Sequence, residues 1–152
     1  AAYEQALQLN PEYAAAYNNK GFILGHLKRY EEALSAFEQA LCLVPALTLG
    51  YKGKGDALVG LHRYEEALKA YEHYARLEPT NDIAYKCLGD VLSMLGRYER
   101  AVIAYEWALR LNPTHALIYH NKGYALNMLK RHEEARLAYE QGRQLGYEYE
   151  KT

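Results

Sequence analysis

Apolar and small residues recur along the chain at helical spacing, in two kinds of segment separated by short polar joints. Each kind places them at i, i+4, i+7 and i+10, which is the spacing of one helical face. One segment contains Tyr17, Gly21, Leu24 and Leu27 at this spacing. The segment that follows it contains Ala33, Phe37, Ala40 and Leu43. The pattern predicts pairs of amphipathic helices joined by short turns.

The pair is copied along the chain with a period of 34 residues, which is marked by Pro11, Pro45, Pro79 and Pro113. Counted from Ala14 as position 1, the period gives four units: 14–47, 48–81, 82–115 and 116–149. Residues 1–13 would be the back half of a truncated unit, and 150–152 a tail. Since Tyr147 stands where a fifth proline would fall, we expect the array to end there, while its N-terminus begins inside a helix.

Small residues occupy two fixed positions of the period. Position 8 is always glycine: Gly21, Gly55, Gly89 and Gly123. Position 20 is always alanine: Ala33, Ala67, Ala101 and Ala135. Glycine inside a helix costs about 1 kcal/mol relative to alanine, so four aligned glycines need a packing reason. A close crossing of the two helices of each pair supplies one.

Composition narrows the function classes. The formal net charge is −1, and 24% of residues are charged, so the basic excess typical of a nucleic-acid surface is missing. No apolar run approaches the roughly 18 residues of a membrane helix. The two cysteines, Cys42 and Cys87, stand at non-equivalent positions of different units, which favours a reduced, cytoplasmic setting. We therefore expect neither a nucleic-acid nor a membrane partner.

The sequence contains no catalytic or cofactor motif: it has no nucleophile elbow, no phosphate-binding glycine loop and no zinc-protease helix. The six histidines are scattered over joints and helices without cysteines or carboxylates that would complete a tetrahedral metal set. Most of the sixteen tyrosines recur at packing positions of the period. We expect no enzyme activity, no catalytic residue, no cofactor and no metal.

The repeated positions resemble those of the tetratricopeptide repeat: an aromatic residue at 4, Gly at 8, Ala at 20, an aromatic residue at 24 and Pro at 32. The resemblance covers essentially the whole chain. It implies an all-α fold, a right-handed α-solenoid of antiparallel helix pairs that forms a single domain over 1–152. It also implies that the first helix of each pair lines a concave, ligand-binding groove.

The groove that this resemblance implies mixes amides, both charge signs and aromatic rings. Its candidate peptide-binding residues are Asn18, Asn19, Phe22, Lys52, Asp56, Lys86, Asp90, His120, Asn121, Tyr124 and Asn127. Such side chains can bond the backbone of an extended peptide and contact its apolar groups. Family members that clamp the C-terminal carboxylate of chaperones carry a Lys, Asn and Arg set that this chain does not reproduce, so that specificity is disfavoured.

The sequence thus predicts a protein-interaction scaffold that binds a peptide or partner segment in its groove. Two alternatives stay open. The array could be a structural spacer that self-assembles end to end through its exposed N-terminal helix, or an accessory domain of a larger enzyme.

Overall fold

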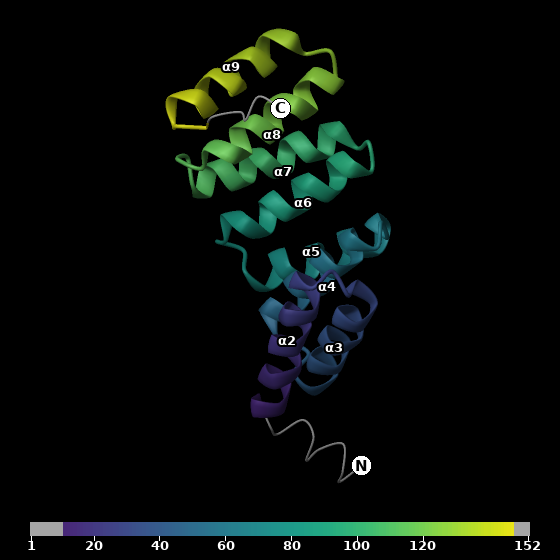
Figure 1. The fold of residues 1–152 in the computed structure, drawn as a ribbon. Helices are drawn as coiled ribbons and strands as arrows, with labels where there is room; N and C mark the ends of the chain where they lie inside the picture. The colour runs from purple at the N-terminus through teal and green to yellow at the C-terminus, as the bar shows by residue number, and fades with distance from the viewer. Residues whose placement is uncertain (1–10, 148–152) are drawn as a thin grey trace. The chain divides into compact units, whose positions relative to one another are not determined.

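The computed structural model describes residues 11–147, and the regular structure in that range is entirely helical (Figure 1). The chain forms two compact units, Ala1–Glu78 and Pro79–Thr152, each of which is described by itself. The first contains α2 (Pro11–His26), α3 (Tyr30–Leu43), α4 (Thr48–Gly60) and α5 (Tyr64–Leu77). The second contains α6 (Asp82–Met94), α7 (Tyr98–Leu111), α8 (Ala116–Met128) and α9 (His132–Gln144). Of the predicted N-terminal half-repeat, residues 1–10 lie outside the described residues, as does the predicted tail, 150–152.

Helices pack in sequential pairs, as the apolar pattern predicts. In the first unit α2 packs against α3 and α4 against α5, while α3 also contacts α4. The second unit repeats this arrangement with α6 on α7, α8 on α9, and α7 on α8. The first helices of neighbouring pairs also meet, α2 with α4 and α6 with α8. Each unit therefore consists of two helix pairs packed side by side.

The repeated glycines make room for an aromatic ring from the second helix of their own pair. A Cβ added at Gly55 would lie 2.4 Å from Cε1 of Tyr71, and one at Gly89 would lie 2.4 Å from Cε1 of Tyr105. Real Cβ atoms do not approach other heavy atoms so closely. The ring thus occupies the volume that a side chain at position 8 would need, which is the packing reason for the glycine.

Each polar joint turns through one residue in the left-handed region of backbone conformation. This residue is at position 15 of every pair: Lys28 (φ 58°), His62 (φ 59°), Gly96 (φ 71°) and Lys130 (φ 60°). In the first joint Arg29 N donates to Leu24 O at 2.9 Å and Lys28 N donates to Gly25 O at 2.9 Å. These two bonds form a Schellman motif, which satisfies carbonyls at the end of the first helix.

An arginine that immediately precedes the second helix of a pair forms an ion pair with the glutamate three residues later. Arg63 Nε lies 2.7 Å from Glu66 Oε1, and the same pairing occurs at Arg29–Glu32 and Arg131–Glu134. This hydrogen bond is the main cause that lowers the pKa of Glu66 below its ordinary value. The side chains of these pairs are exposed, so the pairs add little stability.

The prolines occupy two structural places. Pro11 is the first residue of α2, whereas Pro45, Pro79 and Pro113 lie two residues beyond the last residue of α3, α5 and α7. Tyr147 has the same position in the period and lies three residues beyond the last residue of α9. Unlike proline it has an N–H group, which donates to Gly142 O at 3.0 Å across Gly146 (φ 87°). The end of α9 is therefore closed by its own capping bond.

Candidate functional site

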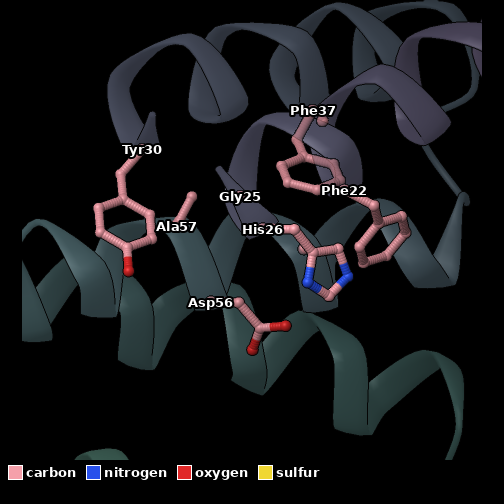
Figure 2. Close-up of a pocket in the computed structure, with 9 residues that line it drawn as sticks. Phe22, Gly25, His26, Tyr30, Phe37, Asp56 and Ala57 are labelled. Carbon is pink, nitrogen blue, oxygen red and sulfur yellow. The ribbon is translucent and has the colours of Figure 1, made fainter. Parts of the chain in front are cut away.

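The first unit contains a pocket between α2 and α4, with a volume of ≈ 210 Å³ (Figure 2). Its lining consists of Gly21, Phe22, Gly25, His26, Tyr30, Phe37, Gly53, Asp56 and Ala57. Figure 2 shows the two phenylalanine rings on one side and Tyr30 on the other, with His26 and Asp56 between them. The pocket thus combines aromatic walls with one carboxylate and one imidazole.

Two glycines keep this pocket open. Gly25 lines it from α2, and a Cβ added there would meet nothing within 4 Å. On α4 a Cβ at Gly53 would fall 2.2 Å from Cζ of Phe37, so the ring takes the space of that side chain. Phe37 in turn meets Phe22 edge to face, with ring centroids 5.1 Å apart, a favoured aromatic geometry. The apolar wall is therefore packed, while the space in front of Gly25 stays free.

The carboxylate of Asp56 is already bonded within the first unit. Lys52 Nζ donates to Oδ2 at 2.7 Å, one turn earlier on α4. Tyr71 Oη donates to Oδ1 at 2.7 Å from α5. The negative charge at the pocket is thus compensated, and the carboxylate is held in one orientation.

The second unit has a pocket at the equivalent place, between α6 and α8, with a volume of ≈ 400 Å³. It is lined by Asp90, Ser93, Met94, Tyr105, His120, Asn121 and Tyr124. Asp90 accepts hydrogen bonds from Tyr105 Oη at 2.8 Å, Asn121 Nδ2 at 2.9 Å and Lys86 Nζ at 2.5 Å. One carboxylate therefore links α6, α7 and α8.

Two groups in the second pocket have shifted pKa values. Tyr105 is only 1% exposed, and burial, followed by the charge of Asp90, raises the pKa of its hydroxyl well above the ordinary range. The hydroxyl thus keeps its proton and can donate to Asp90. Burial lowers the pKa of His120, whose ring packs against Tyr147 with centroids 4.6 Å apart. Both shifts favour the neutral form of the side chain.

The two pockets differ because equivalent positions carry different side chains. At position 9 of the leading repeat, Phe22 in the first unit corresponds to Asp90 in the second. At position 6 of the following repeat, Gly53 corresponds to Asn121. The first pocket is consequently smaller and largely apolar, and the second is larger and more polar.

Several of the candidate residues that the sequence predicts come together in these pockets. Phe22 and Asp56 line the first, and Lys52 bonds to Asp56. The second is lined by Asp90, His120, Asn121 and Tyr124, and Lys86 bonds to Asp90.

Three of the predicted residues lie elsewhere. Asn18 is buried, with 6% exposed, and its Oδ1 has no hydrogen-bond partner. Asn19 is exposed on α2 but lines neither pocket. Asn127 bonds to Tyr139 Oη at 3.5 Å and to His132 Nδ1 at 3.1 Å, also outside the pockets.

The sequence reasoning missed several lining residues. Gly25 and Ser93 both stand at position 12, so the period itself could have identified them. Tyr30, Phe37 and Tyr105 belong to packing positions, yet each also reaches a pocket. A ring assigned to the core can therefore present one edge or its hydroxyl to a groove.

Within residues 11–147, no His, Cys, Asp and Glu side chains gather in threes as a set of metal ligands. Over the same range, none of the helices has both the length and the apolar character needed to span a bilayer.

Comparison with protein families gives matches over most of the chain. A model described as tetratricopeptide repeat matches residues 14–46, and a second model of the same description matches 52–106 and 88–146. Among curated proteins, no sequence matches this chain.

Solved structures of similar fold include several proteins named MamA. "MamA 41-end from Desulfovibrio magneticus RS-1" is 24% identical, covers 90% of this chain and 75% of its own, and has a TM-score of 0.82. "Crystal structure of MamA" is 20% identical, covers 95% and 84%, and has a TM-score of 0.84. At this identity the likeness establishes the fold alone, and it confirms the predicted all-α solenoid of paired helices.

Proposed function

Because the chain belongs to the tetratricopeptide repeat family, we propose that it is an interaction scaffold that binds a peptide or partner segment along its first helices, α2, α4, α6 and α8. The family assignment supports a protein-interaction scaffold in general terms, and repeats of this family are typically not catalytic. Binding along the first helices is the finer part of the proposal.

The observation that carries this proposal is the presence of a pocket at the same place in both units, between successive first helices. Each pocket joins aromatic rings to a fixed carboxylate, Asp56 in one and Asp90 in the other. A side chain of a bound peptide can enter such a pocket while polar groups around it bond to the peptide backbone.

Selection from a library of random twelve-residue peptides, displayed on phage and presented to the full chain, tests the proposal. Tyr124→Ala removes a groove ring that is 49% exposed. Trp107→Ala is the matched control, because Trp107 is 48% exposed and lies on the second helix α7. Loss of a buried aromatic contact should weaken the selected peptides by about tenfold or more for Tyr124→Ala, with little change for Trp107→Ala.

The opposite pattern, with affinity lost in Trp107→Ala and kept in Tyr124→Ala, would assign binding to the second helices. A selection that enriches no peptide would also contradict the proposal.

We further propose a cytoplasmic setting, which is supported by the two cysteines, the exposed Cys42 and the buried Cys87, because neither forms a disulfide. End-to-end self-association through the N-terminal helix stays a prediction, since residues 1–10 lie outside the described range. Sedimentation equilibrium over a range of protein concentrations tests it.

A further inference from the structure

We propose that the pocket between α2 and α4 is a socket for a single aromatic side chain of the partner peptide, with phenylalanine as the anchor. This inference rests on the proposed function and adds the chemistry of the ligand at one defined place. The socket consists of Phe22, Gly25, Tyr30, Phe37 and Ala57, with Gly53 beneath the ring of Phe37.

The size of the socket suits one ring. Its volume is ≈ 210 Å³. In general, an apolar cavity of about 150 Å³ is enough to bind benzene. The free space begins at Gly25, where no atom lies within 4 Å of the position of a Cβ. A phenylalanine side chain that enters from the groove can therefore lie in front of α2 without displacing the protein's own side chains.

The walls favour an aromatic guest over a polar one. Phe22 and Phe37 already meet edge to face, and Tyr30 lies on the opposite side (Figure 2). A third ring between these walls can adopt the offset or edge-on contacts that aromatic pairs prefer. Ala57 is 2% exposed and contributes a methyl group to the lining.

Charge also favours a neutral anchor. Asp56 is bonded by Lys52 and Tyr71, so a basic side chain of the peptide would have to compete with existing bonds for the carboxylate. The pocket of the second unit provides the contrast. There Asp90 and Asn121 stand where the first pocket has Phe22 and Gly53, so a guest ring would meet a bonded carboxylate and amide in place of an aromatic wall. The two pockets thus differ in the side chain that each accepts.

The test uses the full chain and two small probes, N-acetyl-phenylalaninamide and N-acetyl-glycinamide, followed by NMR of the Ala57 methyl and the Phe22 ring. The phenylalanine probe should give saturable shifts at both groups, and the glycine probe should give none. Gly25→Leu fills the socket and should weaken the phenylalanine probe by about tenfold or more. Gln39→Leu, which adds a leucine at an exposed position of α3 outside the pocket, is the matched control and should leave the binding of that probe unchanged.

Thermal unfolding of Gly25→Leu and Gly25→Ala guards against a trivial loss of structure. Both replace a helical glycine that has open space, so both should melt above the parent. A melting temperature for Gly25→Leu below that of the parent would mean that the socket is not free, and would overturn the inference.

Two further outcomes separate this inference from the proposed function. Saturable probe binding that is lost in Gly25→Leu supports the socket even where the peptide selection fails. Selected peptides that bind along the first helices but keep their full affinity for Gly25→Leu overturn the socket and leave the proposed function standing.

Discussion

At the residue scale, glycine has two distinct roles in α2 and α4. Gly55 lies under the ring of Tyr71, where an added Cβ would lie 2.4 Å from Cε1 of that ring. Gly25 faces open space. The 34-residue period predicted a packing reason for Gly55 and its equivalents. It could not predict the role of Gly25, because the same position holds Val59, Ser93 and Asn127 in the other repeats.

The two glycines should respond in opposite directions to alanine. Gly55→Ala forces the ring of Tyr71 to move, and overpacking of a core typically costs about 1–3 kcal/mol. Gly25→Ala meets no obstacle, so removal of a helical glycine should stabilise the protein by up to about 1 kcal/mol. Urea unfolding followed by circular dichroism gives both values. Equal effects of the same sign would contradict the packing account.

His120 should make stability depend on pH in mildly acidic solution. Burial lowers the pKa of His120 in the folded protein, whereas the unfolded chain binds a proton near pH 6.5. Below that pH the unfolded state therefore binds more protons than the folded state, and stability falls as the pH decreases. His120→Gln should reduce this fall between pH 7.5 and pH 5.5, as measured by urea unfolding.

His26→Gln is the control for this comparison, because His26 is an exposed histidine of the other unit. It should retain the pH dependence of the parent protein. If the free energy of unfolding of His120→Gln depends on pH as strongly as that of the parent, the role given to burial of this ring is contradicted.

At the element scale, each joint contains a left-handed residue that the local sequence does not reveal. The polar segment between the two helices was evident from the repeat, and its length follows from the period. The left-handed conformation of one residue in each joint was not evident, since three of the four joints have Lys28, His62 or Lys130 at that position. The signal was Gly96, the one glycine among the four equivalent residues. Lysine and histidine accept this conformation at a cost because the capping bonds require it.

That cost can be measured at Lys130, which adopts φ 60°. Lys130→Gly should raise the free energy of unfolding by up to about 1 kcal/mol, since glycine adopts this conformation without the Cβ clash. Lys130→Val, with a branched Cβ, should lower it. Thermal unfolding of the two variants and the parent checks the order of their melting temperatures. A Lys130→Val variant that melts at or above the parent would contradict the strain assigned to Lys130.

At the scale of the whole molecule, the repeat pattern predicted the helix pairs and their order because periodicity dictates which faces are buried. The family resemblance implied that positions 6 and 9 of the first helices line a groove, and Phe22, Asp90 and Asn121 at such positions line the two pockets. The repeat pattern did not reveal the bonds from Tyr71 to Asp56 and from Tyr105 to Asp90. Those bonds depend on how far a core ring reaches, and a one-dimensional pattern does not contain that distance.

The network around Asp90 joins three helices of the second unit and should contribute to its stability. Tyr105→Phe removes one of three donors to the carboxylate. A hydrogen bond to a charged group contributes about 1.5–3 kcal/mol, and the two remaining donors should hold the loss near the lower figure. Tyr124→Phe, at a half-exposed ring, is the control and should change stability little. A Tyr105→Phe variant with the same free energy of unfolding as the parent, measured in urea, would contradict this role.

The most direct test of the central claim is NMR mapping of a library-selected peptide on the full chain. The account predicts that the perturbed amides lie on the first helices, α2, α4, α6 and α8, and cluster around Asp56 and Asp90. Perturbations confined to the second helices, around exposed residues such as Ile103 and Trp107, would contradict binding along the first helices.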